Sequence, residues 1–249
     1  MTPPIKKRFG LLGRNINYSF SKGYFTEKFE NEKLVGYTYE NFDIPTIESF
    51  WDVIKNNDPL SGINVTIPYK EEVIPFLDKL SKKAIKIGAV NTIRFTKKGK
   101  LKGYNTDYYG FQKSLEPLLE SHHKKALILG TGGASKGVAF ALEELGIEYT
   151  FVSRQASETV LGYNQITDLI FDEYQIVINS TPVGTSPNTE AYPEIPYEFF
   201  TKKHIAYDLI YNPAETQFLK KAHHQGATTK NGLDMLIFQA EKAWKIWNK

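Results

Sequence analysis

A glycine-rich turn between a short apolar stretch and a helix-forming stretch constrains the fold of this 249-residue chain more than any other feature. The apolar stretch is Ala126–Leu129, the turn reads Gly130-Thr-Gly-Gly-Ala-Ser-Lys-Gly137, and residues 135–145 have helical character. Glycines at such a turn let backbone N–H groups approach a pyrophosphate, which the helix dipole also attracts. Similar glycines are often purely structural, but the strand–turn–helix context favours a dinucleotide site. Its backbone would come from Gly130, Thr131, Gly132, Gly133 and Ala134.

The segments around this turn continue the alternation of strand and helix. Short apolar runs predict strands at residues 148–152, 175–179 and 204–208, and a helix is expected from Asp107 to about Leu119. Alternation of this kind is typical of βαβ units with a parallel sheet. We therefore expect a Rossmann-like dinucleotide-binding domain over residues 107–231.

The first part of the chain has an α/β alternation of its own. Strands are predicted at residues 9–13, 37–42 and 62–67, where Pro68 ends the last one. Helix-forming stretches follow at residues 24–30, 47–55 and 70–80. The pattern predicts an α/β fold with two domains, in which the N-terminal domain has a mostly parallel sheet. That domain spans residues 1–106 and is completed by residues 232–249, which include an apolar helical pattern at 233–247.

The end of the strand after the glycine turn indicates which dinucleotide binds. A domain that binds NAD usually places Asp or Glu there to hold the ribose 2′-hydroxyl, whereas a 2′-phosphate requires a cation. In this chain the strand ends in Ser153-Arg154-Gln155. The arginine can pair with a phosphate and stack on adenine, so NADP(H) is favoured. The alternative is an arginine that is merely exposed at a strand end.

Two polar islands carry the residues suited to carbonyl reduction. They are Asn64-Val-Thr-Ile-Pro-Tyr-Lys70 and Gly103-Tyr-Asn-Thr-Asp107, and each ends on an ionisable residue. Lys70 can protonate a developing alkoxide, and Asp107 can hold a neighbouring hydroxyl and orient the lysine. Asn64 and Thr66 share one face of a strand, so both can point at one ligand. Taken singly, such residues are more often caps, turn residues or solvated lysines, and only their clustering favours a site.

The composition excludes several other classes of function. Cysteine is absent, so disulfides, thiolate metal sites and cysteine nucleophiles are excluded. The 31 basic and 28 acidic residues nearly balance, and scattered basic pairs favour a solvated surface over nucleic-acid binding. No stretch approaches the ~20 apolar residues of a membrane span, and the first residues carry no apolar signal region. We expect a cytoplasmic protein without nucleic-acid, membrane or metal partners.

Five short motifs follow one another along the chain. They are Asn64-Val-Thr-Ile-Pro-Tyr-Lys70, Gly88-Ala-Val-Asn-Thr92, Asn105-Thr-Asp107-x-x-Gly110, Gly130-x-Gly-Gly133 and Asn231-Gly-Leu-Asp-Met-Leu-Ile-Phe-Gln239. In order and spacing this set resembles the shikimate dehydrogenase family over nearly the whole chain. The resemblance implies reversible NADPH-dependent reduction of 3-dehydroshikimate to shikimate, a step in aromatic amino acid (chorismate) biosynthesis. For partners we expect only small molecules, and for the assembly a monomer or a homodimer.

The resemblance also implies roles for individual residues. Lys70 and Asp107 would form the catalytic pair. The substrate would be bound by Ser19, Ser21, Asn64, Thr66, Lys70, Asn91, Asp107, Tyr211 and Gln239. The cofactor would contact the glycine turn from Gly130 to Ala134, with Ser153 and Arg154 at the adenosine end and Asn179, Ser180, Thr181, Leu209 and Gly232 on the nicotinamide side. Beside the two serines the chain has Tyr18 and Lys22, where the family usually has a histidine and a proline.

Three alternatives stay open at the level of sequence. A relaxed quinate/shikimate dehydrogenase that uses NAD would differ in the cofactor loop and around Thr66. A non-catalytic nucleotide-binding homologue would keep the fold without turnover, although Lys70 and Asp107 are both present. A folate- or tRNA-linked Rossmann reductase fits the glycine turn alone and leaves the first island and Gln239 unexplained.

Overall fold

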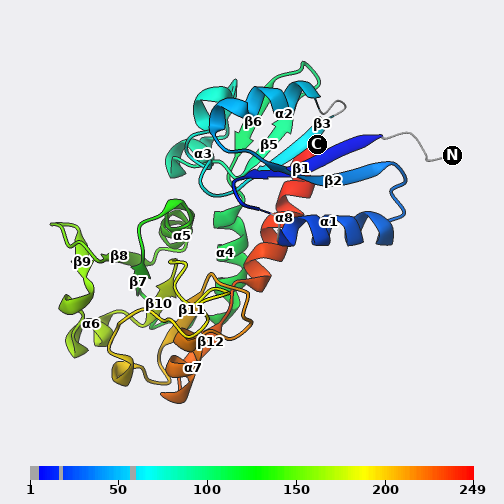
Figure 1. Ribbon diagram of the computed structural model, residues 1–249. Coiled ribbons are helices and arrows are strands. Elements are labelled where there is room, and N and C mark those ends of the chain that lie inside the picture. Colours follow the sequence, from blue (N-terminus) through cyan, green and yellow to red (C-terminus); the bar gives the residue numbers. More distant parts are fainter. Residues whose placement is uncertain (1–5, 17–18, 57–59) are drawn as a thin grey trace. The chain divides into compact units, whose positions relative to one another are not determined.

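The computed structural model describes residues 6–16, 19–56 and 60–249 of the chain. The chain forms two compact units (Figure 1). Unit 1 comprises Met1–Thr106 and Ala240–Lys249, and unit 2 comprises Asp107–Gln239. The chain returns to unit 1 at Ala240, inside the last helix, whereas the sequence pattern placed this return at Gly232. Over the described residues each unit contains one six-stranded sheet with flanking helices, which confirms the α/β fold class.

The sheet of unit 1 is mostly parallel, as predicted, and has the strand order β2-β1-β3-β5-β6-β4. β1 pairs in parallel with β2 and β3, and β4 pairs in parallel with β6. β5 pairs antiparallel with both β3 and β6. The strands are β1 (Lys7–Gly13), β2 (Tyr37–Asp43), β3 (Leu60–Val65), β4 (Lys79–Leu80), β5 (Thr92–Phe95) and β6 (Leu101–Tyr104).

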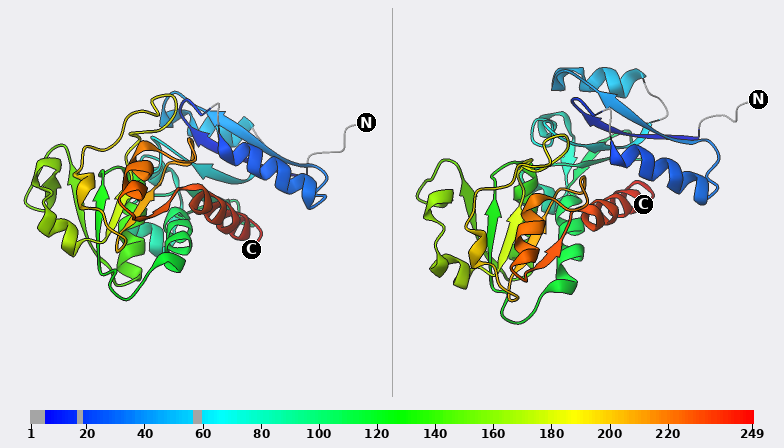
Figure 2. Two further views of the ribbon diagram at one scale, coloured as in Figure 1. Left: turned by 90° about the horizontal axis from the view of Figure 1, so that it is seen from below. Right: turned by 60° about the horizontal axis from the view of Figure 1, so that its bottom comes forward.

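The helices of unit 1 begin where the sequence offers caps. Ser19 is the N-cap of α1 (Phe20–Asn31), and its hydroxyl oxygen accepts a hydrogen bond from the Lys22 N–H at 3.3 Å. Ser81 caps α3 (Lys82–Ile87) in the same way at 3.1 Å. Helix α2 (Phe50–Asn56) continues a 3₁₀ turn at Ile47–Ser49. The end of α8 (Leu233–Trp247) completes the unit and lies beside α1 in every view (Figures 1 and 2).

Residues 70–80, all of which the structure describes, do not form the predicted helix. They form turns, a 3₁₀ turn at Ile74–Phe76 and the short strand β4. Pro75 lacks an N–H group, and its ring would collide with the preceding helical turn. The Lys70 carbonyl instead accepts a hydrogen bond from the distant Val90 N–H at 2.7 Å. Tertiary hydrogen bonding therefore replaces the local helical bonding that the sequence pattern indicated.

An aromatic cluster fastens α1 and the end of α8 to the sheet of unit 1. Its buried members include Phe9, Phe25, Phe29 and Trp247. Gly62 in β3 makes room for Trp247, because a Cβ at this position would lie 2.4 Å from the indole ring. The indole N–H also donates to the Ile93 carbonyl oxygen at 3.0 Å. The predicted C-terminal helix is thus a structural part of unit 1 at its end.

Unit 2 has an all-parallel sheet with the strand order β12-β11-β10-β7-β8-β9. The central strands are mostly apolar, which is typical of parallel sheets covered on both faces. The strands are β7 (Lys125–Leu129), β8 (Glu148–Ser153), β9 (Val160–Gly162), β10 (Ile176–Asn179), β11 (Ile205–Asp208) and β12 (Thr228–Lys230). The helices are α4 (Asp107–Leu115), α5 (Gly133–Glu144), α6 (Asp168–Glu173), α7 (Gln217–His224) and the start of α8. The strands predicted at residues 126–129, 148–152, 175–179 and 204–208 are therefore confirmed.

Candidate active site

The carboxyl edge of the unit 2 sheet gathers most of the predicted cofactor residues. Leu129, Asn179 and Asp208 end the neighbouring strands β7, β10 and β11, and they lie in register with one another. Ser153 ends β8 on the other side of β7. Ligands of open α/β sheets bind at this edge, where the strand order reverses. Here that position lies between β7 and β10.

The glycine turn between β7 and α5 has the shape of a phosphate cradle. Gly130 has a φ of 99°, and a Cβ there would lie 2.9 Å from Cγ2 of Thr181. The turn is therefore packed tightly against the end of β10. Gly132, the N-cap of α5, has open space around its Cβ position. Exposed amides at a helix N-terminus suit a pyrophosphate, so these residues fit a dinucleotide.

The turn after β10 is held in shape by the buried side chain of Asn179. Its Oδ1 accepts from the Thr181 N–H at 3.1 Å and from the Thr181 hydroxyl at 2.6 Å. Its Nδ2 donates to the Val183 carbonyl at 3.3 Å and to Asp208 Oδ1 at 3.1 Å. The Ser180 hydroxyl donates to the Leu129 carbonyl at 2.7 Å. The side chains of Asn179 and Ser180 thus shape the surface that the turn presents.

Asp208 is a buried carboxylate that the sequence did not single out. Besides Asn179, its partners are the Thr216 hydroxyl, which donates to Oδ2 at 2.6 Å, and the Ile210 N–H, which donates to Oδ1 at 3.0 Å. Burial raises the pKa of Asp208 to about 6, and the three hydrogen bonds limit the rise. Asp208 thereby connects the turn after β10 with the segment after β11.

Leu209 and Gly232, two residues predicted to line the nicotinamide side, lie against each other. A Cβ at Gly232 would come within 2.1 Å of the Leu209 carbonyl oxygen. The Gly232 N–H donates to the Ile210 carbonyl at 3.0 Å. Only glycine allows this approach of two backbone segments, and Tyr211 follows directly on one of them.

The adenosine end of the predicted cofactor site is exposed. Arg154 follows β8 directly and is solvent-exposed. Its positive charge acts on the nearby Tyr163, whose pKa is nonetheless raised because burial outweighs that charge. Within the part of the chain that the structure describes, no carboxylate forms an ion pair with Arg154. The guanidinium is therefore available to a phosphate group.

Helix α4 brings a second group of predicted residues close to α8 within unit 2. Asp107 is the first residue of α4 and is buried. One turn later, a Cβ at Gly110 would lie 2.3 Å from the Met235 carbonyl oxygen and 3.0 Å from Cβ of Gln239. Glycine thus lets α4 approach α8 closely beside the buried Gln239.

In unit 1 two of the predicted substrate residues, Asn64 and Asn91, belong to one buried polar network together with Tyr39, Thr92 and Thr106. Tyr39 Oη donates to Asn64 Oδ1 at 2.8 Å. Asn64 Nδ2 lies 3.2 Å from both the Asn91 carbonyl oxygen and Thr92 Oγ1, and donates to each.

Asn91 connects this network to the strand end before Asp107. Its Oδ1 accepts from the Thr106 N–H at 2.6 Å and from the Thr92 hydroxyl at 3.1 Å. Its Nδ2 donates to Thr106 Oγ1 at 3.0 Å. Asn91 and Thr106 are therefore held in place by several hydrogen bonds each.

Lys70 stands on a turn that is anchored on both sides. The Tyr69 ring before it is fully buried, and its hydroxyl donates to the Ile44 carbonyl at 2.8 Å. The Tyr69 N–H donates to the Thr66 carbonyl at 3.0 Å, and the Lys70 carbonyl accepts from Val90. The backbone of Thr66 and Lys70, which begin and end this turn, is therefore held firmly while the Lys70 side chain stays half-buried.

Strand β2 also holds the loop that leads to the two predicted serines. Asp43 accepts hydrogen bonds from the N–H groups of Asn15 and Ile16 at 2.9 and 3.2 Å. Ser19 uses its oxygen as a helix cap, and Ser21 is buried. Tyr18, the departure from the family pattern noted in the sequence, lies outside the described residues.

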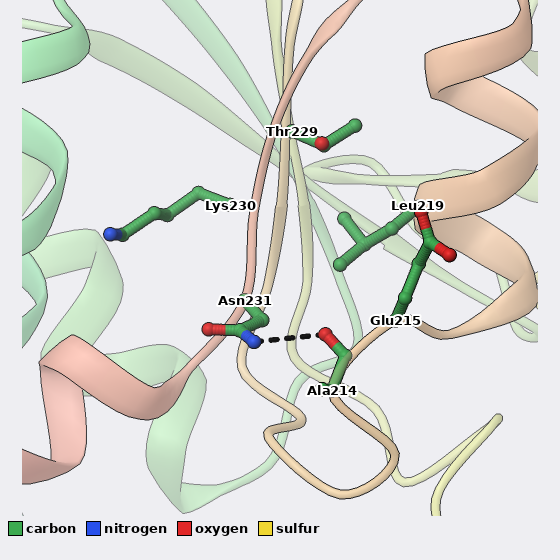
Figure 3. Close-up of a pocket in the computed structure, with 6 residues that line it drawn as sticks. All are labelled: Ala214, Glu215, Leu219, Thr229, Lys230 and Asn231. Atoms are coloured by element: carbon green, nitrogen blue, oxygen red, sulfur yellow. Dashed lines mark hydrogen bonds between the residues drawn. The ribbon is translucent and has the colours of Figure 1, made fainter.

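A surface pocket of about 280 Å³ lies next to the motif that contains Gly232 (Figure 3). Asn231 Nδ2 donates to the Ala214 carbonyl at 2.8 Å across its rim. The other lining residues are Glu215, Leu219, Thr229 and Lys230. The pocket lining contains no residue of the predicted site.

Comparison with known proteins agrees with this arrangement. A shikimate dehydrogenase (NADP(+)) from Methanosphaera stadtmanae is 37% identical to this chain, and the alignment covers 96% of the chain and 90% of that protein. The chain belongs to the shikimate dehydrogenase family. The model of the shikimate dehydrogenase substrate binding domain matches residues 11–93, all of which lie in unit 1.

Solved structures of the shikimate dehydrogenase family share the whole fold. The enzyme from Aquifex aeolicus matches with a TM-score of 0.88 at 34% identity, covering 100% of this chain and 94% of that one. The enzyme from Thermus thermophilus, solved in complex with NADP(H) and shikimate, matches with a TM-score of 0.85 at 32% identity. That match covers 96% of this chain and 92% of the other.

Metal-binding clusters and membrane-spanning helices are both absent from the part of the chain that the structure describes. Among the residues it describes, no group of three or more His, Asp or Glu side chains could hold a metal ion. In the same residues no helix has the length and apolar character that crossing a membrane requires.

The sequence did not single out several residues of these hydrogen-bonded networks. Thr92 and Thr106 lie inside the recognised motifs, so their position beside Asn91 and Asp107 was a usable signal. Asp208 follows an apolar strand at the sheet edge that binds ligands, which is a weaker signal. Tyr39 lies in the middle of β2, and no feature of the sequence indicated its role.

Proposed function

We propose that this protein is an NADP-dependent shikimate dehydrogenase, which reversibly reduces 3-dehydroshikimate to shikimate in the cytoplasm as part of aromatic amino acid biosynthesis. Unit 1 supplies most of the substrate residues, and unit 2 binds NADP(H). The observation that carries the proposal is the buried polar network of unit 1, because a ring with several hydroxyls needs such an array of fixed donors and acceptors. The family relationship over the full chain supports the same assignment.

The substrate side of the proposal assigns one task to each group. Asn64, Thr66, Asn91 and Gln239 hold hydroxyls, while Ser19, Ser21 and Tyr211 hold the carboxylate. Lys70 donates a proton to the carbonyl oxygen as the carbonyl carbon is reduced, so that a C–OH group results. Asp107 accepts a hydrogen bond from a neighbouring hydroxyl and orients the ring. Bound NADPH supplies the hydride that the carbonyl carbon receives.

On the cofactor side, the open turn at Gly132 suits the pyrophosphate, and the amides from Thr131 to Ala134 are its donors. Arg154 and Ser153 hold the 2′-phosphate, because the guanidinium is exposed and is not paired with a carboxylate among the described residues. The turns at Asn179–Thr181 and at Leu209 and Gly232 face the nicotinamide.

The direct test is the oxidation of shikimate with NADP⁺, followed at the absorbance of the reduced nicotinamide. We expect turnover with shikimate and NADP⁺, and much slower turnover with quinate or with NAD⁺. Preference for quinate and NAD⁺ would support the relaxed quinate/shikimate alternative. Binding of NADPH without turnover of any of these substrates would support a non-catalytic homologue.

The role of Lys70 is tested by K70A beside K79A, which removes an exposed lysine of the same unit from β4. We expect K70A to lower kcat by about 100-fold or more, since general acids contribute on that scale. K79A should keep the parent rate. A K70A variant with kcat within about tenfold of the parent and a raised KM would make Lys70 a binding residue.

A further inference from the structure

We propose that Tyr39 is a positioning residue for substrate recognition, because its hydroxyl fixes the orientation of the Asn64 side-chain amide. The inference rests on the proposed function, since it concerns a residue assigned to shikimate. Tyr39 is not itself expected to touch the substrate. It acts through the Asn64 side chain, to which it is hydrogen-bonded.

The ring of Tyr39 is held in one place by the aromatic cluster of unit 1. Tyr39 is 4% exposed, and its ring stacks on Phe25 with centroids 4.7 Å apart and planes 12° apart. The centroids of the Tyr39 and Trp247 rings lie 6.5 Å apart. Packing on this scale restricts the ring to a single orientation, so the position of the hydroxyl oxygen is determined as well.

The hydrogen bond between Tyr39 and Asn64 runs in one direction. Burial raises the pKa of Tyr39 far above its ordinary value, although the Ser21 hydroxyl lowers it in part, so the phenol stays protonated and donates. Its hydrogen goes to Asn64 Oδ1 at 2.8 Å. Tyr39 is therefore the donor of this hydrogen bond and Asn64 the acceptor.

This direction limits what Asn64 can offer a ligand. A side-chain amide has two N–H donors and two acceptor lone pairs. Both donors are used within the protein, by the Asn91 carbonyl and by Thr92 Oγ1, each at 3.2 Å. One lone pair of Oδ1 is used by Tyr39, and one is left. Asn64 is consequently set to accept a hydrogen bond, which selects a hydroxyl of the ligand over a carbonyl or carboxylate oxygen.

Removing the Tyr39 hydroxyl would release this arrangement without disturbing the packing. In Y39F the ring still stacks on Phe25, but Asn64 Oδ1 loses its donor. The amide can then turn and present a donor where the ligand also has a donor. Y37F is the matched control, because Tyr37 lies in the same strand and packs in the same cluster. Its hydroxyl makes no hydrogen bond to any described residue.

The experiment measures steady-state kinetics of Y39F, Y37F and the parent with shikimate and NADP⁺, together with calorimetric shikimate binding. We expect Y39F to raise KM and Kd for shikimate by about three- to tenfold, the effect of one hydrogen bond. KM for NADP⁺ should stay unchanged and kcat should stay within about twofold. Y37F should match the parent throughout. A merely structural role would shift the melting temperature or raise both KM values together.

Shikimate analogues that lack one of the two hydroxyls that are not oxidised sharpen the test. With the analogue that lacks the hydroxyl held by Asn64, parent and Y39F should bind equally, so the difference seen with shikimate disappears. An unchanged shikimate KM in Y39F, or an equal penalty with every analogue, overturns the role of Tyr39 while the parent activity stands. If the parent itself does not turn over shikimate, the proposed function is overturned, and the assignment of Tyr39 with it.

Discussion

The buried carboxyl group of Asp208 makes stability depend on pH by an amount that the structure allows us to work out. Its pKa is raised from the ordinary value of 3.8 to about 6, because burial outweighs its hydrogen bonds. Between these two values the folded protein keeps a proton that the unfolded chain has lost. The stabilisation is therefore complete below the unfolded pKa and is lost as the pH rises through about 6. At 1.36 kcal/mol per pKa unit, the full loss is about 3 kcal/mol.

The substitution D208N should abolish this dependence. Asparagine has nearly the same shape and stays neutral, so its stability does not fall as Asp208 ionises in the parent. The free energy of unfolding of D208N minus that of the parent should rise by about 2.5 kcal/mol between pH 4 and pH 7. Both proteins carry His123 and His204, whose pKa values are lowered by burial, and their contribution cancels in the difference.

The assay is urea unfolding at several pH values, followed by circular dichroism and by tryptophan fluorescence. The three tryptophans are Trp51, Trp244 and Trp247, and all of them lie in unit 1. Where the two units unfold in separate steps, tryptophan fluorescence reports the unfolding of unit 1 alone and serves as an internal control. The pH-dependent difference between D208N and the parent should appear in the unfolding transition of unit 2. A difference between the two proteins that stays constant over this pH range, or that falls with pH, would refute the reasoning.

Two further substitutions test the close helix contact and the choice of cofactor. G110A should lower the free energy of unfolding by about 2 kcal/mol or more, because its Cβ would lie 2.3 Å from the Met235 carbonyl oxygen. G23A, on the exposed face of α1 with nothing near its Cβ, should raise it by about 0.5–1 kcal/mol in the same urea titration. R154A should lower the ratio of kcat/KM for NADPH to that for NADH by about tenfold or more. An unchanged ratio would remove Arg154 from the cofactor site, and equal destabilisation by both glycine variants would contradict the packing argument.

The elements that the sequence predicted correctly are those whose pattern is local. The last helix runs over 233–247 as its apolar spacing indicated, and Pro68 follows the end of β3 closely. The stretch at residues 70–80 has helix-forming residues too, yet it forms turns. Its backbone is bonded to Val90, which is distant in sequence, and Pro75 interrupts the pattern. Local propensity could not reveal a competing partner of that kind.

The site shows the same limit at the level of side chains. The glycines were recognisable because a turn before a helix has few other uses, and the structure gives Gly130 the left-handed backbone that such a turn needs. Tyr39 was not recognisable, because its partner Asn64 lies 25 residues away in another strand. From the sequence, an aromatic residue in a strand is interpreted as a core residue. Tyr39 is a core residue, and its hydroxyl is also a hydrogen-bond partner of Asn64. Only the packed structure separates the two uses.

Each unit thus contains a buried polar side chain that is hydrogen-bonded to candidate ligand-binding residues, but the two side chains differ in their response to pH. Tyr39 keeps its proton at every ordinary pH, because burial raises its pKa far above neutral. Asp208 changes charge near pH 6, among partners that shape the turns after β10 and β11. A rise in pH through 6 therefore introduces a buried charge into unit 2 and leaves the Tyr39–Asn64 hydrogen bond unchanged. The energetic response to pH from these two positions is then confined to the unit assigned to the cofactor.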